Sequence, residues 1–161
     1  MKLRNVVLAL AAVSLLAVTA FAAQLPKPTG LVVNVGAENL ECDWGPVADA
    51  AKYSVDITAT ATYDTGEVDG DSEAILIEVE VQASFGTSDR TDGLSMGDPS
   101  LDIPLSDIEA LVGDLEYELG LLGIDIEDAD VVLTAKVKAL KGNGQGKQNN
   151  PFSDEVPFVL L

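Results

Sequence analysis

The sequence predicts a mainly β fold, an antiparallel β-sandwich with one inserted α-helix at about residues 106–120. Apolar and polar residues alternate over residues 53–63 and again over residues 75–85, which is the period of strands that turn one face to the core and one to water. The period then becomes that of a helix, with apolar residues at Ile108, Leu111, Val112, Leu115, Leu119 and Leu122. One amphipathic helix therefore interrupts a chain that otherwise consists of strands.

The two long alternating segments are expected to be antiparallel neighbours. Residues 64–73 between them form a polar loop with two glycines, as expected for a hairpin connection. Both segments exceed the mean strand length of about 5–6 residues, so we expect them to project beyond the rest of the sheet. Shorter strands are expected on both sides of this pair, at residues 31–35, 39–44, 100–105, 131–140 and 152–160.

The helix has its own start and stop signals. Ser106 and Glu109 have the spacing of a capping box, in which both side chains satisfy amides at the helix N-terminus. Gly120 or Gly123 supplies the C-terminal cap. We expect the apolar stripe of this helix to close one end of the sandwich.

Residues 1–23 have the pattern of a signal peptide. Lys2 and Arg4 precede a long uncharged apolar run, and a small-x-small cleavage site follows at residues 20–22. The run approaches the ~20 residues of a membrane-spanning helix, so an uncleaved anchor is the alternative interpretation. The mature chain, residues 24–161, is expected to be a single domain without membrane insertion. Its expected location is the extracellular space, the periplasm or the cell surface.

Acidic residues dominate the composition. The chain has 27 Asp and Glu residues against nine Lys and Arg residues, and its formal net charge is −18 at pH 7. Loss of Lys2 and Arg4 with the signal peptide makes the mature charge −20. Such a surface repels nucleic acid and anionic membranes, so neither is an expected partner.

The composition also excludes several kinds of chemistry. The sequence contains no histidine, which removes histidine acid–base catalysis, Ser-His-Asp triads and histidine metal sites. Its single cysteine, Cys42, cannot form a thiolate zinc site. Leu40, Cys42 and Trp44 alternate with polar residues, so Cys42 is expected to be a buried apolar side chain. We expect no catalytic residues and a protein that is not an enzyme.

One loop has the oxygen ligands that suit calcium. The candidate ligands lie within ten residues of one another and are Asp64, Glu67, Asp69, Asp71 and Glu73. The EF-hand pattern is not matched, because Val68 and Gly70 break its register. A sparser acidic set follows at Asp89, Asp92 and Asp98. The alternative interpretation of the first set is a solvated hairpin tip, and no cofactor other than this calcium ion is expected.

The basic residues are concentrated near the C-terminus. Four of the seven in the mature chain lie on the strand at 131–140 or in the loop after it, at Lys136, Lys138, Lys141 and Lys147. Loops at one end of a sandwich often form its binding surface. The residues expected to contact a partner are Lys141, Asn143, Lys147 and Asn149. An ordinary flexible loop is the alternative interpretation.

The order of these segments resembles a fibronectin type III domain. In that family an inward tryptophan ends strand B, a Pro-Val turn follows and a tyrosine begins strand C, and the matching residues here are Trp44, Pro46, Val47, Ala51 and Tyr53. Val137 and Ala139 match the end of strand F, and residues 150–156 match the approach to strand G. The resemblance covers both ends of the mature chain.

The middle of the chain departs from the family. Residues 64–73 and 86–128 are longer and more helical than the usual connections. The tyrosine corner of the family would require a tyrosine where this chain has Leu133, so that corner hydrogen bond is expected to be absent. An immunoglobulin-like relative is the alternative interpretation.

The resemblance implies a secreted, non-catalytic binding or adhesion module that recognises an extracellular glycan or protein. The alternative function is a self-assembling structural subunit of an extracellular or cell-surface assembly. Such a subunit would use its long edge strands for strand addition.

Overall fold

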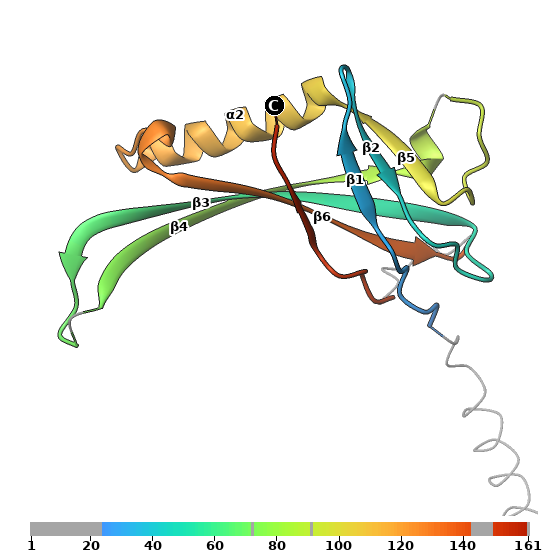
Figure 1. The fold of residues 1–161 in the computed structure, drawn as a ribbon, viewed down its shortest axis with the longest axis horizontal. Coiled ribbons are helices and arrows are strands. Elements are labelled where there is room, and N and C mark those ends of the chain that lie inside the picture. Colours follow the sequence, from blue (N-terminus) through green and yellow to red (C-terminus); the bar gives the residue numbers. More distant parts are fainter. Residues whose placement is uncertain (1–23, 72, 91, 143–149, 161) are drawn as a thin grey trace, which may run out of the picture.

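The structure is a computed structural model that describes residues 24–160 apart from residues 72, 91 and 143–149. The expected signal peptide, residues 1–23, lies outside the described residues. The described chain is mainly β, with two antiparallel sheets and one α-helix (Figure 1). This confirms a β-rich architecture compatible with a β-sandwich.

The elements lie close to the positions expected from the sequence. In chain order they are β1 (Val32–Val35), β2 (Asn39–Asp43), β3 (Lys52–Val68), β4 (Ala74–Gly86), η1 (Thr87–Asp89), β5 (Ser100–Pro104), α2 (Leu105–Leu121), η2 (Ile126–Asp128), β6 (Asp130–Leu140) and β7 (Val156–Phe158). One sheet has the strand order β1-β2-β5, and the other has the order β4-β3-β6-β7. The core lies between these two layers.

The alternating segments form the long hairpin that was expected. Strands β3 and β4 pair antiparallel from Ser54 and Gly86 to Asp64 and Leu76. The connecting loop is shorter than the expected 64–73, because β3 continues through an irregularity to Val68. The end of the hairpin that these two strands form projects from the body of the molecule (Figure 1).

The inward row of β3 explains its alternating sequence. This row is buried and consists of Tyr53, Val55, Ile57, Ala59 and Ala61. The facing row of β6 is buried as well and consists of Leu133, Ala135, Val137 and Ala139. Successive side chains of a strand point to opposite faces. The polar residues that alternate with the buried ones along β3 and β6 therefore lie on the outer face of the sheet.

Helix α2 lies on the inner face of the four-stranded sheet, beside the three-stranded sheet (Figure 1). The expectation that it closes one end of the sandwich was wrong. Strands β3 and β4 extend beyond the three-stranded sheet, and the helix covers the apolar face that they would otherwise expose to water. Its buried side chains are Ile108, Leu111, Leu115 and Leu119.

The two ends of α2 differ in how well they were predicted. The helix begins at Leu105 directly after β5, and no side chain caps it, so the expected capping box is not formed. Instead the amide of Leu105 donates to the carbonyl of Glu38 at 2.9 Å. At the C-terminus Gly123 has φ +75°, and its amide donates to the carbonyl of Gly120 at 3.1 Å. The next amide, that of Ile124, donates to the carbonyl of Leu119 at 3.1 Å. Together the two bonds form a Schellman motif, and they confirm the expected glycine cap.

The last strand is shorter than expected. Instead of residues 152–160, β7 covers only Val156–Phe158, and Phe152 makes a single bridge to β6. Between them the hydroxyl of Ser153 accepts the amide of Val137 at 3.0 Å. A side chain thus satisfies a β6 amide that a longer β7 would otherwise have paired.

The segment from Trp44 to Tyr53 is fixed by its two aromatic rings. They meet edge to face, with centroids 5.1 Å apart, which is a favourable geometry for aromatic pairs. The phenol oxygen of Tyr53 accepts the amide of Val47 at 2.9 Å. Trp44 is buried, and within the described residues its indole Nε1 has no hydrogen-bond partner. The contact between Trp44 and Tyr53 therefore joins the two ends of the turn that connects the two sheets.

Cys42 is 1% exposed, as its inward position predicted. Burial, and then the nearby carboxylates of Asp43 and Asp102, raise the pKa of its thiol to about 12. The thiol is therefore protonated at neutral pH and is a poor nucleophile. In the part of the chain that the structure describes, no helix has the length and apolar character needed to cross a membrane.

Candidate functional site

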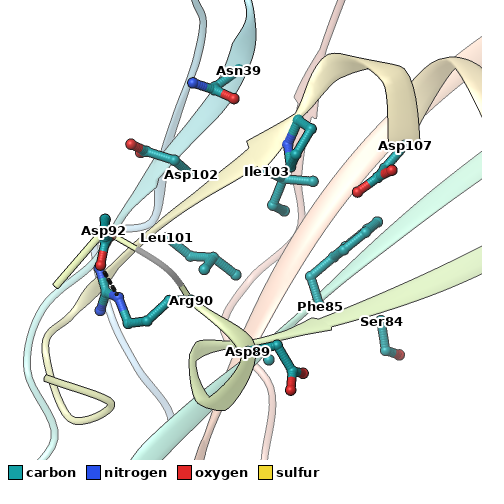
Figure 2. A pocket seen from close by; sticks show the side chains of 12 residues that line it. Asn39, Ser84, Phe85, Asp89, Arg90, Asp92, Leu101, Asp102, Ile103 and Asp107 are labelled. Carbon is teal, nitrogen blue, oxygen red and sulfur yellow. Dashed lines mark hydrogen bonds and ion pairs between the residues drawn. The ribbon is translucent and has the colours of Figure 1, made fainter. Parts of the chain in front are cut away.

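An open groove of about 510 Å³ lies where the two sheets leave a gap at their edges. Strand β4 is the last strand of one sheet, and β5 is the last strand of the other. The apolar part of the groove is formed by Phe85 from β4 and by Leu101 and Ile103 from β5 (Figure 2). The groove is therefore a gap in the side wall of the sandwich with an apolar floor.

Polar side chains from five different elements surround this floor. They are Asn39 of β2, Ser84 of β4, Asp89 of η1, Asp102 of β5 and Asp107 of α2. Asp107 lies in the first turn of its helix, where the helix dipole favours a negative charge. Asp102 alternates with the buried Leu101 and Ile103, so it lies on the solvent side of the same edge strand.

Arg90 and Asp92 form a fixed ion pair at one side of the groove (Figure 2). The guanidinium donates to both carboxylate oxygens, with N–O distances of 2.8 and 2.7 Å. It also donates to the carbonyl of Ser95 at 2.9 Å. The Arg90 side chain is only 4% exposed. Because it is buried and bonded to both Asp92 and Ser95, it closes the loop before β5 and makes this loop a rigid wall of the groove.

The ion pair changes the proton affinity of both partners. The hydrogen bond from Arg90, and then that from the amide of Leu94, lower the pKa of Asp92. The hydrogen bond with Asp92 raises the pKa of Arg90 against the opposing effect of its burial. Asp92 is therefore charged and paired. In the described chain no ion pair joins a basic residue to Asp89, Asp102 or Asp107.

We expect Asp92→Asn to lower the melting temperature in a pH-dependent way. A carboxylate whose pKa is lowered by folding stabilises the fold at any pH above its unfolded-state pKa of about 3.9. This stabilisation is lost as the pH falls through the lower pKa of the folded state. The variant should therefore melt at a lower temperature than the wild type at about pH 6, and the difference between the two melting temperatures should shrink below about pH 4. Thermal melts across this range test it, with Asp114→Asn on the exposed face of α2 as the control. A difference that does not change with pH would contradict this account.

The predicted calcium ligands are brought to one hairpin tip. The carboxylate of Asp69 accepts the amides of Asp71 and Glu73 at 2.8 and 3.0 Å. The carboxylate of Asp64 accepts the amide of Gly66 at 2.9 Å. Leaving aside the residues that are not described, no three acidic or cysteine side chains gather as metal ligands. Two of the five carboxylates thus shape the tip itself, and the calcium site stays a prediction.

The predicted partner loop is described only in part. Lys141 follows β6, whereas Asn143, Lys147 and Asn149 lie outside the described residues. On β6 itself, the ammonium groups of Lys136 and Lys138 lie 5.1 and 4.6 Å from the centre of the Phe152 ring. Their spacing of two residues indicated a common face of the strand, but nothing in the sequence indicated the ring between them.

Sequence reasoning missed most of the groove. Asp89 and Asp92 belonged to the sparser acidic set, but the structure separates their roles: Asp92 is paired, and Asp89 lines the groove. Asp98, the third member, accepts the amide of Ser95 at 2.6 Å and does not line the groove. The other lining residues come from distant strands, and no local pattern connects them.

The fold and the groove define a two-sheet β protein with one covering helix and an open, acidic gap at its edge. No protein-family model matches the chain, and no curated protein matches it.

Proposed function

We propose that the chain is an exported, non-catalytic binding module that holds a positively charged segment of a protein partner in the β4–β5 groove. The observation that carries this proposal is an apolar floor flanked by three carboxylates that form no ion pair in the described chain. A lysine or arginine side chain matches both parts, because its stem is apolar and its end is charged. The groove suits such a side chain better than it suits an uncharged glycan.

The edges of the two sheets add to this proposal. Among the described residues, strands β4 and β5 each have a neighbour in their sheet on one side only. The outer edge of such a strand presents amides and carbonyls that an extended peptide can pair with. A partner segment along this groove can thus combine main-chain hydrogen bonds with ionic contacts to Asp102 and Asp107.

The non-catalytic part of the proposal rests on composition. The sequence has no histidine and a single cysteine. That cysteine is buried, and its pKa is raised to about 12. The groove holds carboxylates and one neutralised arginine, which suit recognition of a cation.

We also propose that the sandwich is of the fibronectin type III kind. The geometry of Trp44 and Tyr53, with the Tyr53 hydroxyl on the amide of Val47, supports the resemblance in this turn. The strand partition adds to it, because β4 pairs with β3. In the constant-type immunoglobulin arrangement, the fourth strand joins the sheet of the first two strands instead.

A peptide-binding measurement tests the groove. The probe is a labelled peptide of alternating lysine and valine, titrated into the chain from residue 24 onward, with a glutamate–valine peptide as the reference. We expect the lysine peptide to bind and Asp102→Asn with Asp107→Asn to weaken it about tenfold, because two ion pairs of about 0.7 kcal/mol each are lost.

A matched control separates the groove from the general charge of the protein. Asp114→Asn with Glu118→Gln changes the net charge by the same amount on the exposed face of α2. This variant should bind almost as the wild type does. Equal weakening by both variants, or equal binding of both peptides, would overturn the proposed function.

A further inference from the structure

The charges of the four-stranded sheet are separated along its length. The tip of the β3–β4 hairpin is acidic, and all five of its carboxylate side chains are exposed: Asp64, Glu67, Asp69, Asp71 and Glu73. Apolar side chains are exposed there as well, since Val68 is 63% and Leu76 is 57% exposed. The tip is thus an acidic projection with an apolar component.

The opposite end of the same sheet is basic. Lys52 is the first residue of β3, and on the neighbouring strand Lys136 and Lys138 lie opposite Asp56 and Ser54. These lysines alternate with buried core residues, so they share the outer face of the sheet. We call them the lysine end.

An aromatic ring organises the lysine end. Phe152 bridges to β6 at Lys138 and lies within 5.1 Å of the ammonium groups of both β6 lysines. Such contacts with an aromatic ring are attractive, so they hold two like charges side by side. One of the two, Lys136, also contacts Glu155 at 3.4 Å. Asp56 lies opposite Lys136 on β3, so with Glu155 two carboxylates offset part of the charge of the three lysines. The lysine end keeps a net charge of +1 on a molecule that is otherwise strongly acidic.

The two ends cannot meet within one molecule. Strand β3 has 17 residues and joins them, and at about 3.3 Å per residue it spans roughly 55 Å. The hairpin also points away from the sandwich (Figure 1). A second copy of the chain can bring its acidic tip to the lysine end of the first, where Val68 and Leu76 can pack near Phe152.

We propose that the protein associates head to tail, with the acidic tip of one copy bound to the lysine end of the next. The charges of the two surfaces are complementary, and both belong to the same chain. Because the two surfaces differ, the contact is heterologous. A pair of molecules still has one free acidic tip and one free lysine end, so further copies can add and form open chains. This inference uses neither the groove nor its proposed ligand.

Residues 24–161 have a net charge of −20, because Lys2 and Arg4 are left out of the −18 of the full chain, and this makes the salt dependence of the association unusual. At about 0.01 M salt the screening length is about 30 Å, so whole molecules repel one another. At about 0.15 M it is about 8 Å, which screens distant charges but leaves those in contact interacting. At about 1 M even the contact is screened. Association should therefore be strongest at intermediate salt.

Charge reversal at each end gives a decisive experiment on the chain from residue 24 onward. The tip variant carries Glu67→Lys, Asp71→Lys and Glu73→Lys, and it keeps the two carboxylates that accept loop amides. The end variant carries Lys52→Glu and Lys138→Glu, and it keeps the Lys136–Glu155 pair. Each variant alone should be monomeric in sedimentation velocity at about 0.15 M salt, whereas the wild type should form larger species.

Mixing the two variants provides the critical result. The tip of each variant is then complementary to the lysine-end surface of the other, so the mixture should associate again although neither component does. Matching thermal melts show that both variants fold. A wild type that is monomeric at every salt concentration, or a mixture that stays monomeric, would overturn the proposal. A monomeric wild type that binds polyglutamate would assign the lysine end to an anionic partner instead.

Discussion

Leu115→Ala will lower the free energy of unfolding by about 3 kcal/mol, within the range of about 2–5 kcal/mol found for leucine-to-alanine changes in cores. Leu115 lies in the middle of α2 and is 0% exposed. The helix covers the part of the inner face of β3 and β4 that the three-stranded sheet does not reach (Figure 1). A cavity at this position therefore weakens the only layer above that part of the sheet within the described fold. Urea denaturation followed by circular dichroism measures the loss.

The same helix supplies the control. Leu121 is chemically identical and 64% exposed, so Leu121→Ala should change the stability by less than about 0.5 kcal/mol. Helix propensity favours alanine slightly over leucine in both variants, so it does not account for a difference between them. If the two variants lost equal stability, α2 would not pack on the sheet through the face that contains Leu115.

The contrast between these two leucines shows how far the sequence could predict the fold. Leu115 belongs to the apolar stripe of α2, and that stripe is a local pattern, as is the alternation in β3 and β4. Local periodicity therefore predicted the helix and the long hairpin. Local periodicity could not predict where the helix lies. Its position depends on how far β3 and β4 extend beyond the three-stranded sheet, and that sheet is built from strands that are distant in sequence.

The ends of elements were less predictable than their interiors for a related reason. Gly123 caps α2 through backbone geometry that glycine itself favours, so a local signal was sufficient. The N-terminus of the helix is instead satisfied by the carbonyl of Glu38, which is far away in the chain. Ser106 and Glu109 had the correct spacing, but they lie within the helix, which starts at Leu105.

The candidate site was the least predictable part. Its floor comes from β4 and β5, and its carboxylates come from η1, β5 and α2. The sequence did show an excess of acidic residues, but it could not show which ones share a groove. Asp92 looks like Asp89 in the sequence, yet only Asp92 is neutralised by Arg90.

Thr87 connects the core of the sandwich to the loop that forms the groove wall. It is 0% exposed, and its hydroxyl oxygen accepts the amide of Tyr53 at 2.9 Å. The same hydroxyl donates to the carbonyl of Met96 at 2.6 Å. One side chain thus fixes the start of β3 and the loop that contains Arg90.

Thr87→Val should cost about 2 kcal/mol, because it keeps the shape of the side chain but leaves the buried amide of Tyr53 and the part-buried carbonyl of Met96 without this partner. Thr87→Ser removes one methyl group and should cost only about 0.8 kcal/mol. Chemical denaturation of the two variants gives this order directly. If valine were as well tolerated as serine, the hydroxyl would contribute nothing to stability.

Hydrogen exchange distinguishes the lost hydrogen bond from a packing defect. In Thr87→Val the amide of Tyr53 should exchange faster than in the wild type, whereas in Thr87→Ser it should stay protected, because the serine hydroxyl can accept the same bond. Release of Met96 also loosens the loop from Arg90 to Ser100. The lysine–valine peptide should then bind the valine variant more weakly, although Thr87 does not line the groove. Faster exchange at Tyr53 together with unchanged peptide binding would show that the loop keeps its position through the Arg90–Asp92 pair alone.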